Sequence, residues 1–211
     1  MSLEHQEEKP SVLPAGQGFS LLNTVKYKGR FLYSKYDPKR SLLSLIQNTT
    51  FLPGSLILLC SPALWYGLEE LENKLPSDSY IVAIEGDEEL FNFSAAINKG
   101  IDFYSKKNIG EFYSKLKKLI NTGKVKRAIR LDFSAGIYFE KEFYLNTCYD
   151  AEQLIASFWK NRLTITKMGR LFAKNIFKNL SLLPNERTFS SLFNSVNKPI
   201  LLLGAGESLR S

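Results

Sequence analysis

A glycine-containing stretch at residues 204–209 has the composition and spacing of a phosphate-binding loop. It reads Gly-Ala-Gly-Glu-Ser-Leu and follows an apolar run at residues 200–203. An apolar run that leads into Gly-x-Gly is typical of a buried parallel strand opening onto such a loop. We therefore predict that the backbone of Gly204 and Gly206 and the hydroxyl of Ser208 bind a phosphate group. The third glycine of the dinucleotide fingerprint is missing. The alternative is a tight turn between strand and helix, and it is favoured because no helix follows the loop in this sequence.

A second candidate is the strand–loop–helix–strand pattern at residues 55–87. In a nucleotide-binding unit of this kind, glycines after the first strand admit a phosphate, and an acid at the end of the second strand binds ribose hydroxyls. Glu85 and Asp87 stand at the place of that acid, and Glu85 is the predicted ribose ligand. The loop itself reads Ser-Pro-Ala-Leu-Trp-Tyr, and Gly67 follows late. These bulky residues favour a Rossmann-like fold with a filled pocket, in which Glu85 is only an acid at a helix start.

A third cluster places Ser34, Lys35 and Asp37 within four residues, a combination of side chains found in catalytic sites. The simpler interpretation is structural. Asp37 is a good N-cap and Pro38 suits the first position of a helix, so the pair predicts a helix start. Ser34 and Lys35 then belong to the turn before that helix.

Other reactive residue types are scarce. His5 is the only histidine and lies in an N-terminal segment that we predict to be disordered. Cys60 and Cys148 are far apart in the sequence and form no CxxC motif. Neither a histidine-based triad nor a zinc site is predicted. The low cysteine content also favours a reducing, cytoplasmic location over a disulfide framework.

The elements that would position these residues alternate between strand and helix. Apolar runs at 55–60 and 80–84, with a helical pattern at 68–75 between them, predict a parallel βαβ unit that is covered on both faces. Further strands are predicted at 101–104 and 125–133, and helices at 88–97 and 108–121. A hairpin at 20–33 precedes the unit, and a capping box at 150–153 predicts a long helix that ends near 183.

The predicted fold class is therefore α/β: a Rossmann-like parallel sheet with flanking helices, preceded by a small β-hairpin and followed by a long helical linker. We expect the parts to be a disordered tail, a hairpin segment with one helix, a Rossmann-like domain, the linker, and the first strand and Gly-x-Gly turn of a second domain, at residues 1–18, 19–50, 51–148, 149–197 and 198–211. Because a phosphate loop needs a helix after it, we expect the chain to be the front part of a longer protein.

The formal net charge of +7 is unevenly distributed along the chain. Residues 99–211 hold 20 Lys and Arg against nine Asp and Glu, whereas residues 1–98 are net acidic. A basic half could face nucleic acid, anionic lipid, an acidic partner or a phosphorylated substrate. A Lys-rich solvated surface is favoured over nucleic-acid binding. No apolar stretch approaches the roughly 20 residues of a membrane span, so no span is predicted.

Several segments, in their order along the chain, resemble one known family. They are residues 23–27 with Gly29, the Tyr-Ser-Lys-Tyr-Asp-Pro stretch at 33–38, the unit at 55–87, the long helix with Trp159, Asn161, Asn175 and Asn179, and residues 199–209. From about residue 20 the chain resembles the motility accessory factor (Maf) flagellin glycosyltransferases and the related 6-hydroxymethylpterin diphosphokinase MptE-like proteins. Of the family's first glycine-rich loop and the acid after the next strand, only Tyr66, Gly67 and Glu85 are kept. Of its second, Gly204, Gly206, Ser208 and Leu209 match, and Glu207 replaces a proline.

The resemblance implies transfer of a nonulosonic acid, such as pseudaminic or legionaminic acid, from a CMP-activated donor to Ser or Thr of flagellin. The catalytic domain of that family follows the second loop, so we expect this chain to lack activity and cofactor by itself. A CMP-activated sugar is expected only in a full-length form. The implied role is scaffold or acceptor recognition, with flagellin or another acceptor protein as partner.

Two alternatives to that role stay open. The chain could be a nucleotide-binding enzyme of the pterin diphosphokinase or methyltransferase-like type, using residues 61–67 and Glu85. It could also be a non-enzymatic protein-binding module that uses the basic helix at residues 160–178.

Overall fold

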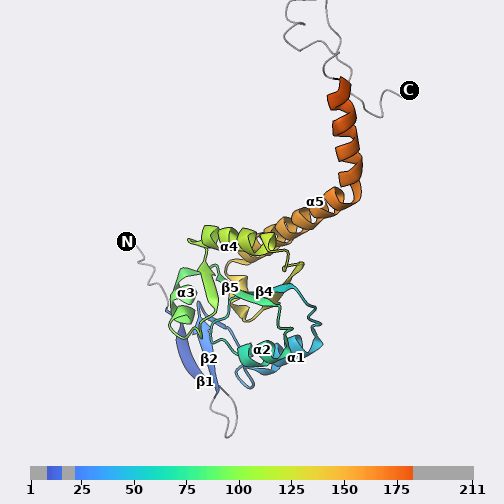
Figure 1. The fold of residues 1–211 in the computed structure, drawn as a ribbon. Helices are drawn as coiled ribbons and strands as arrows, with labels where there is room; N and C mark the ends of the chain where they lie inside the picture. The colour runs from blue at the N-terminus through green and yellow to red at the C-terminus, as the bar shows by residue number, and fades with distance from the viewer. Residues whose placement is uncertain (1–8, 16–21, 183–211) are drawn as a thin grey trace, which may run out of the picture. The chain divides into compact units, whose positions relative to one another are not determined.

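The computed structural model of the protein describes residues 9–15 and 22–182, and it confirms the predicted α/β class (Figure 1). The strands are β1 Ser11–Ala15, β2 Leu22–Tyr27, β3 Arg30–Phe31, β4 Ser55–Cys60, β5 Tyr80–Glu85, β6 Asp102–Ser105 and β7 Arg127–Asp132. The α-helices are α1 Arg40–Asn48, α2 Leu68–Lys74, α3 Glu88–Ala95, α4 Ile109–Asn121 and α5 Lys141–Leu182, with a 3₁₀ turn at Ala135–Tyr138.

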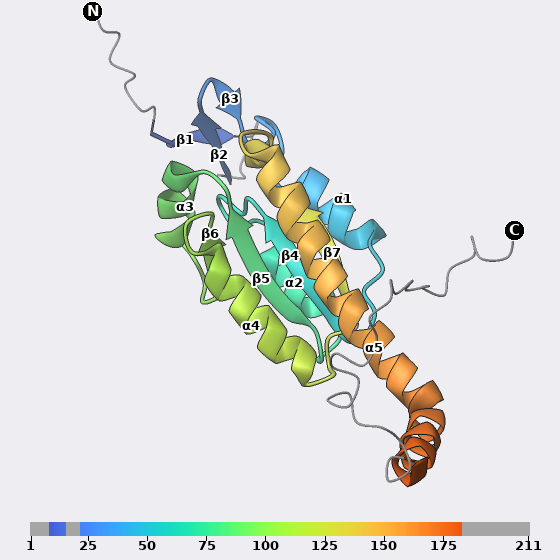
Figure 2. The same cartoon turned by 90° about the horizontal axis from the view of Figure 1, so that it is seen from above.

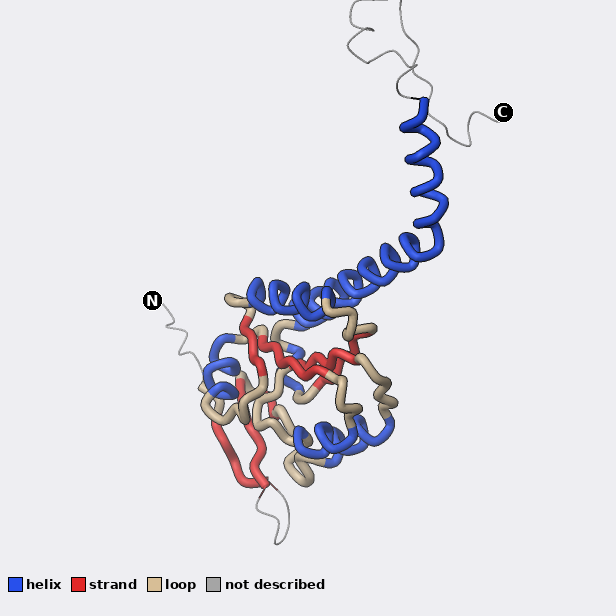
Figure 3. The backbone as a smooth tube through the Cα atoms, in the orientation of Figure 1, coloured by secondary structure: helices blue, strands red, loops and turns tan. Residues whose placement is uncertain are grey.

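The main sheet has four parallel strands in the order β6-β5-β4-β7 (Figure 2). The strands are red in Figure 3. β4 is central and buried along its whole length, because its continuous apolar sequence suits a strand that is covered on both faces. Its successive side chains alternate between two core clusters. Ile57 and Leu59 belong to one cluster, and Leu56, Leu58 and Cys60 belong to the other.

Helices cover both faces of this sheet (Figure 2). Leu42 of α1 and Leu71 of α2 pack in the cluster with Ile57. Phe112 of α4 and Tyr144 of α5 pack in the cluster with Leu58. The amphipathic pattern of each helix therefore explains which of its own sides packs on the sheet. No helix in the described part of the chain is long and apolar enough to cross a membrane.

The hairpin forms a separate three-stranded antiparallel sheet in the order β1-β2-β3. The prediction of a disordered tail to residue 18 was wrong for residues 11–15, since β1 pairs with β2 and places Val12 opposite Val25. The β-branched and apolar residues of this short segment suit an edge strand. The predicted hairpin turn at Lys28 and Gly29 is confirmed, and both residues have positive φ.

One predicted helix start is displaced by two residues, and another was wrong. α1 begins at Arg40 rather than at Pro38, but Asp37 Oδ1 accepts hydrogen bonds from the backbone N of Lys39 and Arg40, as the predicted cap does. α5 begins at Lys141 rather than at the predicted capping box. Asp150 of that box lies inside the helix, and its Oδ2 accepts a hydrogen bond from Tyr113 Oη.

The contacts divide the chain into two units, Met1–Arg162 and Leu163–Ser211. The first contains both sheets and the part of α5 up to Arg162. The described part of the second is the continuation of α5 to Leu182. The expected linker at 149–197 is thus shared between the units, because Ala151 and Ile155 belong to the core of the first.

Candidate functional site at the carboxyl edge of the sheet

The strand order locates the place where a fold of this class binds its ligands. The chain runs from β4 to β5 and β6 on one side, and then returns to form β7 on the other side of β4. Open α/β sheets bind ligands in the crevice beyond the carboxyl ends of the strands at such a switch point. Here the crevice lies between the loop after β4, residues 61–67, and the loop after β7, residues 133–140.

The two loops touch directly across this crevice. Ser61 Oγ and Ser134 Oγ are 3.1 Å apart, and both residues are buried. The backbone N of Gly136 donates to Ser134 Oγ at 3.1 Å. A Cβ atom placed on Gly136 would lie 2.2 Å from Ser61 Oγ, so glycine is required at this approach. The protein's own atoms therefore occupy the floor of the crevice.

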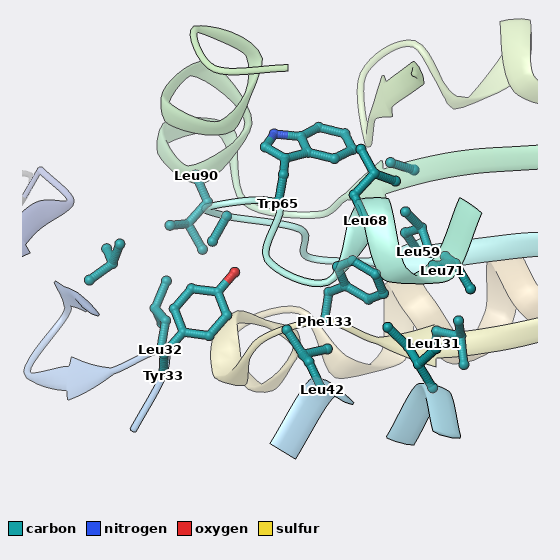
Figure 4. Packing of buried hydrophobic residues seen from close by; sticks show 14 of the residues in the cluster. Leu32, Tyr33, Leu42, Leu59, Trp65, Leu68, Leu71, Leu90, Leu131 and Phe133 are labelled. Carbon is teal, nitrogen blue, oxygen red and sulfur yellow. The ribbon is translucent and has the colours of Figure 1, made fainter. Parts of the chain in front are cut away.

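Tyr33 of the hairpin segment closes the loop after β4 from the other side. Its hydroxyl donates to the backbone O of Pro62 at 2.6 Å and accepts from the backbone N of Leu64 at 3.0 Å. Figure 4 shows the ring among the core residues, with the hydroxyl turned toward the loop that carries Trp65. Burial raises the pKa of the Tyr33 phenol, so the group is neutral and serves as both donor and acceptor. The backbone N of Ala135 donates to the backbone O of Leu32 at 2.9 Å, which ties this segment to the loop after β7.

The loop after β4 has an unusual backbone conformation. Positive φ recurs at every second residue, at Ser61, Ala63, Trp65 and Gly67. Non-glycine residues rarely adopt this conformation, and it persists only where the surroundings hold it. Here the surroundings do so, because Trp65 is buried and its Nε1 donates to the backbone O of Ser94 at 2.8 Å. The filled pocket that the sequence favours agrees with these contacts.

Glu85, the predicted ribose ligand, is fully buried at the end of β5. Its Oε1 accepts from the backbone N of Gly86 at 2.9 Å, from that of Asp87 at 3.2 Å, and from the hydroxyl of Tyr144. Among the described residues, its Oε2 has no hydrogen-bond partner. Burial raises the pKa of Glu85 to about 7, against the opposing effect of these hydrogen bonds. A nucleotide would have to displace protein atoms to reach this carboxylate, and its role as a ribose ligand stays a prediction.

Asp87, the neighbouring acid, caps α3 and holds the hairpin. Its Oδ1 accepts from the backbone N of Leu90 at 3.1 Å and from Tyr27 Oη at 2.9 Å, and its Oδ2 pairs with Lys28 Nζ at 2.7 Å. Burial acts to raise the pKa of Asp87, but these hydrogen bonds outweigh it and the pKa lies below its ordinary value. The sequence identified the acid but not its long-range partners.

The cluster of Ser34, Lys35 and Asp37 forms a turn, as the simpler interpretation predicts. Ser34 Oγ accepts from the backbone N of Tyr36 and Asp37. Lys35 Nζ lies 4.1 Å from the centroid of the Phe31 ring. These contacts leave no nucleophile activated by a neighbouring base within this cluster. Gly204, Gly206 and Ser208, the other predicted site residues, lie outside the described residues.

An open pocket of about 570 Å³ lies beside the filled crevice. The hairpin segment, α1 and the loop after β7 line it, and its walls include Phe31, Ser34, Leu45, Asp132 and Tyr138. Tyr138 is 59% exposed, and the Arg30 guanidinium carbon lies 5.0 Å from the centroid of its ring. Asp132 is paired with Arg130 through two hydrogen bonds, at 2.6 and 3.0 Å. Sequence reasoning missed this pocket because its walls come from three separate parts of the chain.

The fold also brings together the two cysteines that the sequence separates. Cys60 at the end of β4 and Cys148 of α5 are both buried free thiols with Sγ atoms 3.9 Å apart. The hydrogen bond with Cys148 and burial raise the pKa of the Cys60 thiol. Within residues 9–15 and 22–182, no group of three or more His, Cys, Asp or Glu side chains is placed to hold a metal ion.

Comparison with known proteins gives a relative without a known function. No protein-family model matches the chain, and no solved structure gives a significant match. The chain is similar to an uncharacterized protein of Treponema pallidum (strain Nichols), with 28% identity over 211 residues. The match covers 95% of this chain and 36% of the relative, so the chain spans about a third of the length of that protein.

Proposed function

We propose that these residues form the N-terminal scaffold and acceptor-recognition region of a Maf/MptE-like protein, a family that transfers nonulosonic acids from CMP-sugars to Ser or Thr of flagellin. The observation that carries the proposal is the filled switch-point crevice. When side chains of the protein occupy this crevice, the sheet can still serve as a scaffold, but no space is left there for a nucleotide.

The hydrogen bonds of the loop after β4 support the proposal that the CMP-sugar does not bind in this crevice. A phosphate in a fold of this class is held by backbone amides of that loop. The backbone N of Leu64 donates to Tyr33, and Ser61 Oγ lies against Ser134 Oγ. The CMP-activated donor would therefore bind in another part of a full-length protein.

The open pocket beside the crevice is the proposed place for the acceptor. Phe31 and Tyr138 offer aromatic surfaces, Asp132 offers carboxylate oxygens, and the Ser34 hydroxyl, whose oxygen already accepts from two backbone amides, has an O–H to donate. A peptide segment rich in Ser or Thr presents hydroxyl and amide donors that a carboxylate binds, and carbonyl oxygens that a serine hydroxyl binds. Aromatic side chains supply contact area for the same segment at low conformational cost.

The test uses binding of nucleotides and of flagellin to the purified chain. Calorimetric titration with CMP, ATP and S-adenosylmethionine should give no binding heat, whereas immobilised flagellin should retain the chain. Tyr138→Ala should weaken that retention. Tyr36→Ala is the matched control, since Tyr36 is 75% exposed and is not a wall of the pocket.

Saturable heat with any of these three ligands would instead support the nucleotide-binding enzyme. Equal retention of both tyrosine variants would contradict the acceptor pocket. Failure of flagellin to retain the unmodified chain would contradict flagellin as the acceptor.

A further inference from the structure

The continuation of α5 from residue 163 to residue 182 carries two stripes of opposite character. Ile165, Met168, Phe172 and Ile176 follow the spacing of three, four and four residues that keeps side chains on one face of a helix. Four cations repeat the same spacing two residues later, at Lys167, Arg170, Lys174 and Lys178. A step of two residues turns a helix by about 200°, so the cationic stripe lies on the face opposite to the apolar stripe.

The side chains of the apolar stripe are exposed. Their exposed fractions range from 40% for Met168 to 67% for Ile165, and Leu180, which continues the stripe by one further turn, is 51% exposed. Large apolar side chains arranged in a continuous exposed row mark a surface for interaction rather than ordinary surface composition. Leu163, Leu171 and Phe177 are also exposed, but they lie on the cationic side of the helix and take no part in the stripe.

The charge of this segment has one sign only. No Asp or Glu occurs between Glu152 and Glu186, while that interval contains six Lys and Arg residues. A helix with cations on its polar face and Phe, Ile and Met on the other face has the properties of one that lies in the plane of a membrane surface. Its apolar face enters the headgroup boundary, and its cations are attracted by anionic lipids.

We propose that residues 163–182 of α5 bind the surface of an anionic lipid membrane through this apolar stripe. The charge pattern favours a membrane over an acidic protein groove. If the apolar stripe were bound in an acidic protein groove, the cations on the opposite face would point away from the acidic groove walls. On a membrane they stay within about one Debye length of the lipid charges, because a helix is only about 10 Å thick. The inference is independent of the acceptor pocket, which lies in the other unit.

The experiment is co-sedimentation of the full chain with vesicles. One set contains equimolar phosphatidylcholine and phosphatidylglycerol, and the other contains phosphatidylcholine alone. The chain should bind the anionic vesicles and should bind the neutral ones far more weakly. Each cation near an anionic surface contributes about 1 kcal/mol, or about fivefold in binding. The double variant Lys167→Gln/Lys174→Gln should therefore bind about tenfold to thirtyfold more weakly.

A second variant tests the apolar stripe, and a third is the matched control. Phe172→Ser/Ile176→Ser should reduce binding at least about tenfold, because both side chains lose their burial in the headgroup boundary. Lys117→Gln/Lys118→Gln removes two exposed cations from α4 in the other unit and should leave binding within about twofold of the unmodified chain. Circular dichroism of each variant checks that the helix is kept.

Three results would overturn the proposal. The first is equal binding to neutral and anionic vesicles. The second is unchanged binding of Phe172→Ser/Ile176→Ser, which would show that the apolar stripe does not enter the membrane. The third is full competition by soluble polyglutamate, which would show that the helix recognises negative charge alone and would favour an acidic protein partner.

Discussion

The buried carboxyl group of Glu85 makes stability depend on pH in a window that can be predicted. Its pKa rises from an ordinary 4.5 to about 7 because the group is fully buried. The unfolded chain therefore releases this proton at lower pH than the folded protein does. The contribution of Glu85 to stability is complete below about pH 4.5 and is lost as the pH rises through about 7.

The magnitude follows from the two pKa values. A shift of the pKa from 4.5 to about 7 corresponds to a change of about 3 kcal/mol in the free energy of unfolding. Most of this change occurs between about pH 5 and about pH 8. Glu85→Gln keeps an acceptor for the backbone N of Gly86 and Asp87 but removes the titration. When the pH is raised across this window, the free energy of unfolding of the variant should therefore rise by about 2–3 kcal/mol relative to that of the unmodified protein.

The assay is urea unfolding at several pH values for the unmodified protein, for Glu85→Gln and for Glu72→Gln. Glu72 is an exposed acid of α2, so its variant controls for the loss of one negative charge. Asp87 has a lowered pKa, and its contribution is lost only as the pH falls below its ordinary value of 3.8, outside the window. Parallel pH curves for Glu85→Gln and the unmodified protein would refute the reasoning.

Three further substitutions test the filled crevice and the core by the same unfolding measurement. Tyr33→Phe leaves the buried carbonyl of Pro62 and the partly buried amide of Leu64 without their partner, so the free energy of unfolding should fall by about 1–3 kcal/mol, and a neutral result would show that water replaces the hydroxyl. Gly136→Ala forces a Cβ against Ser61 Oγ and should lower the free energy of unfolding by about 1–3 kcal/mol. Gly110→Ala is the control, because open space surrounds Gly110, and it should not destabilise the protein. Leu58→Ala removes a fully buried side chain of the central strand and should cost about 2–5 kcal/mol, and a loss below about 1 kcal/mol would contradict its place in the core.

Local sequence patterns were enough to predict the elements at the centre of the sheet. The continuous apolar runs of β4 and β5 predict buried parallel strands, and the two strands pair in parallel with Leu58 opposite Val82. The periodicity of residues 108–121 predicts α4, which begins at Ile109 and buries Phe112 and Leu116. In each case the burial pattern of one short segment determines both its conformation and the face that it buries.

Features that depend on distant partners could not be predicted in this way. The position of β7 beside β4 depends on pairing with a strand about 70 residues away, and local patterns carry no such information. The start of α5 at Lys141 was missed because the capping-box pattern at 150–153 is a local signal, whereas Tyr144 and Cys148 are held in helix by packing on the sheet.

The same distinction between local patterns and distant partners applies to the candidate site. The bulky residues after Cys60 predict a filled pocket. Tyr33, which holds the loop after β4 in place, lies in the hairpin segment, and its hydrogen bonds to Pro62 and Leu64 join positions about 30 residues apart. The proximity of Cys60 and Cys148 likewise arises only when α5 packs on β4.

The most direct test of the filled crevice is a titration of the ¹⁵N-labelled chain with CMP, followed by the amide resonances of Ser61, Leu64 and Gly136. These amides lie in the two loops that meet at the switch point. We predict that they do not shift as CMP is added, because the side chains of Tyr33 and Ser134 already contact these loops. Saturable shifts confined to these amides would show that the crevice binds a nucleotide and would contradict the scaffold role.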